Sequence, residues 1–191
     1  KIPRNSVGTK HIKKGAIKGF RFTWNLIVGV PLLVPSFMYE GVHNQHHAKR
    51  YYGTVDDPEY LPLALMHWWT LPVFILAAAL APIALLLRYA VLTPLSVVIP
   101  PFRQVVVERY SGLQINPSFR RRSPEGVERR LWHRLEAAAS VYAITLIGLT
   151  VTGIIPLKAF LIFLAVTSVL AVVNQVRTLV AHLWENEGEA M

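Results

Sequence analysis

The chain of 191 residues contains no cysteine. This absence excludes disulfide frameworks, thiolate zinc sites, iron–sulfur clusters and cysteine nucleophiles. A metal site would have to use carboxylates and the seven histidines. Charged residues are also scarce, at 16% of the chain against about a quarter in ordinary globular proteins, whereas 53% of the residues are hydrophobic. The composition therefore predicts a protein with lipid as its main solvent.

Acidic residues are few. Eleven Asp and Glu stand against twenty Lys and Arg, so the formal net charge is +9. Residues 1–21 carry no acid and no apolar core of the kind found in a signal peptide. An anionic membrane surface accounts for both the basic charge and the apolar composition, so we expect no nucleic-acid partner. We expect residues 1–191 to form a single membrane domain that is part of a longer protein.

Long apolar runs define the expected fold. A bilayer span needs about 20 apolar residues, and residues 61–101 provide enough for two. The single charge of Arg88 near the middle of this run predicts two helices with a tight turn at that point. Residues 135–155 and 159–173 form a second pair joined by a short turn. Residues 20–39 are apolar but interrupted by proline, which indicates a kinked or interface-lying segment. We therefore predict an all-α integral membrane protein with about four transmembrane helices, arranged as two hairpins.

The distribution of basic residues predicts the topology. Positively charged loops remain in the cytoplasm, and the two densest basic stretches are residues 1–21 and 102–134. Because each hairpin leaves and returns, the histidines outside the apolar runs should share the cytoplasmic face. These are His11, His43, His46, His47, His133 and His182.

The stretch HNQHH contains three histidines at His43, His46 and His47. On a helix, positions i, i+3 and i+4 lie on one face, so the three imidazoles can converge. Neutral imidazole is a common ligand for zinc, iron and copper. The alternative is a solvated histidine-rich loop, and the triple spacing favours the metal site. Elsewhere, His133 is predicted to be a surface residue and His67 to pack at the membrane interface.

The acidic stretch DDPEY follows the histidines. Asp56, Asp57 and Glu59 can orient ligand imidazoles by hydrogen bonding. An Asp-Pro pair also favours a turn without any metal role. The sequence supports both interpretations equally.

Two stretches, HNQHHAKRYYGTVDDPEYLPLA and NQVRTLVAH, resemble the membrane fatty acid desaturase family. In that family, three histidine boxes on the cytoplasmic side hold two non-haem irons. The middle box matches His43, His46 and His47 position for position. The resemblance also implies His11 and His182 as iron ligands. Two positions depart from the pattern, because Val7 stands where the first box has its first histidine and the last His-x-x-His-His box is absent.

The resemblance implies oxygen-dependent desaturation of a fatty acyl chain at a di-iron site. Membrane lipid and an acyl-chain substrate would be partners, and ferredoxin or cytochrome b5 would donate electrons. Related hydroxylases and ketolases use the same histidine boxes, so the boxes do not decide between desaturation and these two reactions. The incomplete boxes leave a third alternative, a truncated membrane protein without activity.

Overall fold

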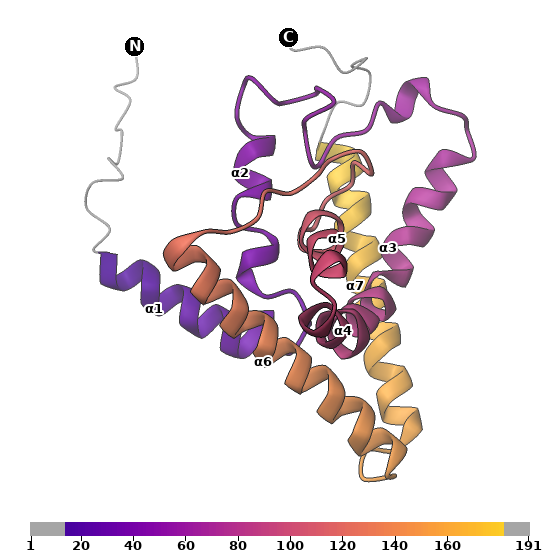
Figure 1. Cartoon of the computed structure of the whole chain (residues 1–191). Helices are drawn as coiled ribbons and strands as arrows, with labels where there is room; N and C mark the ends of the chain where they lie inside the picture. The colour runs from indigo at the N-terminus through magenta and orange to yellow at the C-terminus, as the bar shows by residue number, and fades with distance from the viewer. Residues whose placement is uncertain (1–13, 182–191) are drawn as a thin grey trace.

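The structure is a computed structural model that describes residues 14–181. These residues form helices and connecting loops without a β-strand (Figure 1). The symbol η marks π- and 3-10-helical segments. In chain order the helices are α1 (Lys14–Trp24), η2 (Asn25–Gly29), η3 (Ser36–Met38), α2 (Val42–His46), η4 (Leu63–Leu65), α3 (Thr70–Leu87), η5 (Arg88–Leu92), α4 (Thr93–Val98), α5 (Pro100–Tyr110), α6 (Gly126–Val151) and α7 (Leu157–Ala181).

Three helical runs are long and apolar enough to cross a bilayer: Thr70–Val98, Gly126–Val151 and Leu157–Ala181. Their surfaces are largely uncovered by the rest of the chain, which fits helices surrounded by lipid. The predicted all-α membrane fold is thus confirmed. The expected second hairpin is also present, since α6 and α7 are joined by a short turn in which Gly153 has a φ of +78°. α7 then packs along α3.

The expected first hairpin is replaced by a single bent run of helix. Instead of a tight turn at Arg88, the chain continues from α3 through the π-helical η5 into α4. Pro94 explains the π segment, because its ring cannot donate to the helix and would collide with the preceding turn. Arg88 does not break the helix because its side chain reaches Glu136 at 2.5 Å and the carbonyl of Tyr110 at 2.8 Å. The described residues therefore contain three candidate spans rather than four.

The N-terminal apolar segment is kinked, as predicted. The π-helical η2 follows α1, and the chain then reverses near Pro31 and Pro35. The buried side chain of Asn25 holds this reversal, because its Oδ1 accepts the Ser36 amide at 2.8 Å and its Nδ2 donates to the Ser36 hydroxyl at 3.0 Å. No single helix covers residues 20–39.

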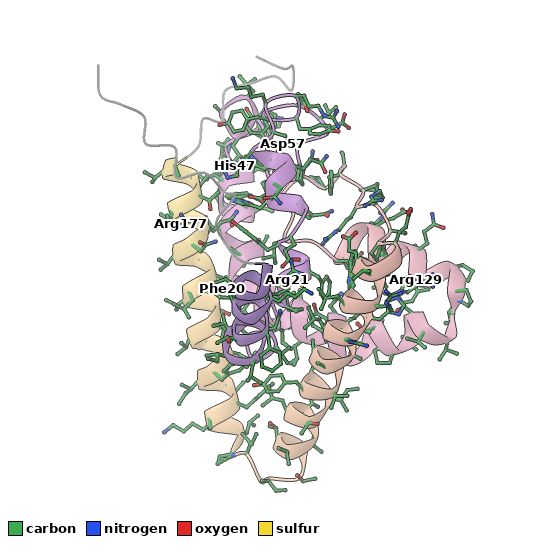
Figure 2. All side chains as sticks on the ribbon, turned by 90° about the vertical axis from the view of Figure 1, so that its left-hand side faces the viewer. Phe20, Arg21, His47, Asp57, Arg129 and Arg177 are labelled. Carbon is green, nitrogen blue, oxygen red and sulfur yellow. The ribbon has the colours of Figure 1, made fainter. Side chains whose placement is uncertain are left out.

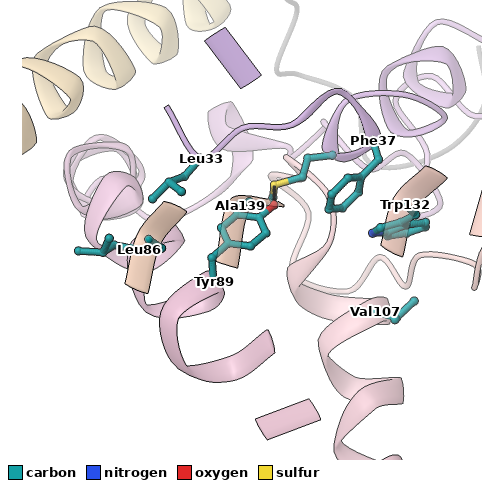
Figure 3. Close-up of a cluster of buried hydrophobic side chains, with 9 residues drawn as sticks. Leu33, Phe37, Leu86, Tyr89, Val107, Trp132 and Ala139 are labelled. Carbon is teal, nitrogen blue, oxygen red and sulfur yellow. Dashed lines mark hydrogen bonds between the residues drawn. The ribbon is translucent and has the colours of Figure 1, made fainter. Parts of the chain in front are cut away.

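A hydrophobic core joins the reversal to η5 and α6 (Figure 3). The rings of Phe37 and Trp132 lie with their centroids 4.8 Å apart. The buried Tyr89 donates its hydroxyl to the sulfur of Met38 at 2.9 Å. This core anchors the segment that leads directly into α2.

Candidate metal centre

The His-x-x-His-His motif forms the short helix α2. His43 and His46 lie within it, and His47 is its C-cap with helical backbone angles. The Nε2 atoms of His43 and His47 are 2.9 Å apart. The ring centroid of His46 lies 6.1 Å from that of His43 and 5.1 Å from that of His47. The helical spacing thus brings the three rings together.

Two carboxylates orient two of these rings. Nδ1 of His46 lies 2.9 and 3.0 Å from the oxygens of Asp57, and both side chains are almost fully buried. Nδ1 of His43 lies 3.0 and 3.2 Å from the oxygens of Glu59. An ionised carboxylate can only accept, so each Nδ1 carries the proton. Each ring consequently presents the Nε2 lone pair, the form in which a histidine ligates a metal.

The stretch DDPEY therefore forms a turn and also supplies carboxylates to the histidines. The two adjacent aspartates have different roles. Asp57 is buried against His46, whereas Asp56 is exposed and its backbone carbonyl accepts from Gln45 at 3.1 Å. Within residues 14–181, the Asp56 side chain forms no hydrogen bond or ion pair with the three histidines.

The Asp57 carboxylate is held by its own loop. Figure 2 shows Asp57 close to His47 near the top of the molecule. It accepts the backbone N–H groups of Gly53 and Glu59, each at 2.9 Å. Gly53 adopts a φ of +73°, a conformation that glycine reaches without strain. The side chain of Asn116 donates to the carbonyls of Val55 at 2.8 Å and Asp57 at 3.0 Å. A residue about sixty positions away along the chain thus fixes the loop that orients His46.

Arg121 supports the other end of α2. Its buried guanidinium donates to the carbonyls of Ser111 and of Glu40 and lies 4.3 Å above the ring of Trp132. Sequence reasoning missed Arg121 and Asn116, because the first looked like one charge of a solvated basic loop. The Asn-Pro pair at residues 116–117 was the one local signal of a structured turn.

The environment of His46 sets its protonation. Burial lowers the pKa of His46, but the hydrogen bond and charge of Asp57, with the charge of Glu59, raise it more, so the net pKa is above the ordinary value. The same carboxylates make the ring a stronger donor toward a cation.

The donor set fits a metal that prefers imidazole, such as iron. Two nitrogens bound at about 2.0–2.1 Å and about 90° apart on one ion are separated by about 2.9 Å, the separation of the His43 and His47 Nε2 atoms. A hydrogen bond between the two rings has the same length. Within residues 14–181, no three metal-binding side chains converge on one point. The structure therefore brings two candidate ligand nitrogens, Nε2 of His43 and Nε2 of His47, to a separation that fits one ion.

The other candidate histidines lie apart from this cluster or outside the described residues. His11 and His182 belong to the undescribed ends of the chain. His133 is exposed, as predicted for a surface residue. His67 is also exposed, with its ring centroid 6.3 Å from that of Trp69, and its place at a membrane interface stays a prediction.

Comparison with known proteins identifies relatives of the chain. The fatty acid desaturase family matches residues 11–190. The chain is 43% identical over 181 residues to a ceramide hydroxylase of Caulobacter vibrioides (strain NA1000 / CB15N). That alignment covers 95% of this chain and 51% of the relative, so the chain spans about half the length of the protein it matches. No solved structure matches.

Proposed function

The chain belongs to the fatty acid desaturase family, and from this premise we propose that it forms part of a membrane enzyme that oxidises a lipid acyl chain with dioxygen. The observation that carries the proposal is the pair of carboxylate-oriented rings on α2, His46 with Asp57 and His43 with Glu59. Metal-ligating histidines characteristically donate their second ring nitrogen to a carboxylate in this way. A solvated histidine loop gives no reason to bury Asp57 completely.

We propose His43, His46 and His47 as iron ligands, joined by His11 and His182 from the ends of the chain. Two non-haem irons, when bound, would supply the redox chemistry that activates dioxygen toward an unactivated C–H bond. Asp57 and Glu59 hold the rings of His46 and His43 in the ligating tautomer. The apolar surfaces of α3, α6 and α7 support a position of this polar cluster at the edge of a lipid phase, where an acyl chain is available.

Hydroxylation is the reaction that we favour, with ceramide as the substrate class. The support is the 43% identity to a relative named ceramide hydroxylase. In hydroxylation, one oxygen atom is inserted into a C–H bond of the chain and the second leaves as water, so a donor must supply two electrons and two protons are taken up. An electron-transfer protein such as ferredoxin or cytochrome b5 meets this requirement.

Desaturation is the second candidate, because the family description names it. It removes two hydrogens from adjacent carbons and also needs two electrons from outside. The two reactions differ in their products. Hydroxylation adds an oxygen atom to the lipid, whereas desaturation removes two hydrogen atoms, and mass spectrometry separates these outcomes.

The test is expression from the complete coding sequence with an electron-donor system, followed by lipid and iron analysis. We expect His46→Ala to abolish iron binding and product formation. His133→Ala is the matched control, because His133 is exposed and belongs to α6 rather than to α2. Retention of iron and product by His46→Ala would remove α2 from the mechanism. A chain that binds no iron and yields no product with all histidines intact would support the inactive alternative.

A further inference from the structure

A groove runs between the N-terminal segment and α6, with a volume of about 730 Å³. This is within the usual range of ligand pockets, roughly 300–1,000 Å³. One stripe of each segment forms the walls. The lining residues of the first are Lys18, Arg21, Phe22, Asn25, Leu26, Val30 and Pro31, and those of α6 are Val127, Arg130, Leu131, Arg134, Leu135, Ala138 and Tyr142.

The charge of this groove is of one sign. Four cations line it, and none of the described lining residues is acidic. Arg21 pairs with Glu40 at 2.8 Å, with both side chains more than a third exposed. Lys18, Arg130 and Arg134 take part in none of the ion pairs formed within residues 14–181. Three cations therefore face a shared space without an ion-pair partner among the described residues.

The groove is also polar at one end and apolar at the other. Lys18 and Arg21 lie in the middle and the last turn of α1, and Arg130 and Arg134 lie in the first half of α6, so along each segment the cations precede most of the apolar lining residues. Figure 1 shows α1 and α6 running in the same general direction, toward the lower right. Apart from Asn25, the later lining positions are apolar or aromatic, with Leu26 and Val30 on one wall and Ala138 and Tyr142 on the other. An occupant must therefore carry an anionic head and an apolar tail.

The surroundings indicate that this boundary lies at a membrane interface. Phe20, Phe22, Leu26 and Ile27 are between 64% and 71% exposed, an unusual density of large apolar side chains on one short segment. A basic amphipathic helix of this kind lies in the plane of the bilayer surface. On the opposite wall, the basic first turns of α6 give way to its apolar span at Leu135.

We propose that this groove binds one anionic phospholipid of the surrounding bilayer. The phosphate lies among Lys18, Arg130 and Arg134, and one acyl chain follows the apolar walls toward Tyr142. A bilayer supplies such molecules directly at the height where the cations stand. Figure 2 shows Arg21 of the groove wall well below His47 and Asp57, so the lipid site is separate from the histidine cluster. The proposal does not depend on iron binding or on the oxidation reaction.

The first experiment is competition between lipids. The chain is reconstituted in nanodiscs of phosphatidylcholine and phosphatidylglycerol, extracted, and its retained lipid is counted by native mass spectrometry. The wild-type chain should retain phosphatidylglycerol in preference to phosphatidylcholine. Each Lys or Arg near an anionic headgroup contributes about fivefold in affinity, so Lys18→Gln/Arg130→Gln/Arg134→Gln should lose on the order of 100-fold. Unchanged circular dichroism verifies that this variant is folded.

The matched control removes three charges from exposed positions outside the groove, as Lys49→Gln/Arg109→Gln/Arg122→Gln. It should retain phosphatidylglycerol as the wild type does. If it loses as much as the groove variant, the attraction is a property of net charge and the proposed site is overturned. Equal retention of the two lipids by the wild type would overturn it as well.

A second variant tests the apolar part of the groove without changing charge. Ala138 lines the groove in the apolar part of α6, so Ala138→Trp should fill the space that the acyl chain occupies. We expect loss of retained lipid even though all four cations are present. If Ala138→Trp retained the lipid fully, the proposal that an acyl chain lies between α1 and α6 would be overturned.

Discussion

The substitution Asp57→Asn should weaken metal binding far more than the same change at the neighbouring Asp56. The carboxylate of Asp57 accepts from His46 through both oxygens, and each oxygen also accepts one backbone N–H, that of Glu59 or that of Gly53. An amide keeps one of these acceptors and replaces the other with a donor. The substitution must therefore leave at least one of the three donors without its partner.

Two magnitudes follow from these contacts. Leaving a buried donor unsatisfied costs about 1–3 kcal/mol, which for a chain of this size lowers the unfolding temperature by roughly 2–12 °C. If the amide nitrogen faces His46, the ring proton moves to Nε2 and the lone pair for the metal is lost. Removing a carboxylate partner of this kind costs 10- to 100-fold in metal affinity, or about 1.4–2.7 kcal/mol.

The assay is titration of the purified chain with ferrous iron under anaerobic conditions, together with thermal unfolding of the metal-free chain. Asp56→Asn is the control, because it makes the same chemical change one residue away at an exposed side chain. We expect Asp56→Asn to match the wild type in both measurements. Equal affinities and unfolding temperatures for the two variants would refute the assignment of Asp57 as the residue that positions His46.

Three further outcomes are expected. Glu59→Gln should reduce iron affinity about 10-fold, the low end of the range for a carboxylate partner of a metal ligand. The loss is small because Glu59 is less buried than Asp57 and the new glutamine side chain can still accept a hydrogen bond from His43. Iron titration measures this affinity, and a loss as large as that of Asp57→Asn would contradict the prediction. Glu136→Gln should destabilise the chain by about 3–5 kcal/mol, because it removes the carboxylate that pairs with the buried guanidinium of Arg88. Glu125→Gln at an exposed position is the control, and an equal unfolding temperature for the two variants would refute this prediction. The raised pKa of His46 predicts a contribution to the stability of the metal-free chain that is present at pH values below 6.5 and is lost as the pH rises through the raised pKa. Thermal unfolding across that pH range checks the trend. The unfolding temperature of Asp57→Asn should depend less on pH over the same range.

The helical spans and the α2 cluster could be predicted from local sequence. Apolar runs of sufficient length specify spanning helices because the backbone must satisfy its hydrogen bonds within each segment in lipid. The spacing of His43, His46 and His47 depends only on the helical repeat. The proline-rich interruption of residues 20–39 likewise predicted a kink, because proline acts on its own turn.

The role of each polar side chain could not be predicted locally. The sequence predicted a turn at Arg88, because a single charge in an apolar run is expected to be solvated. In the structure the charge is buried, because Arg88 pairs with Glu136, 48 positions away along the chain. Asp56 and Asp57 are chemically identical in the sequence. The backbone turn at Gly53 and the hydrogen bond from Asn116 to the Asp57 carbonyl determine which of the two aspartates faces His46.

The sequence by itself determined that this is an all-α membrane protein with a histidine helix, because apolar length and helical periodicity are properties of neighbouring residues. The tertiary structure decided which charges are buried, which carboxylate orients which imidazole, and where four cations face an apolar groove. Burial of a charge is stable only when a partner satisfies it, and that partner can come from anywhere along the chain.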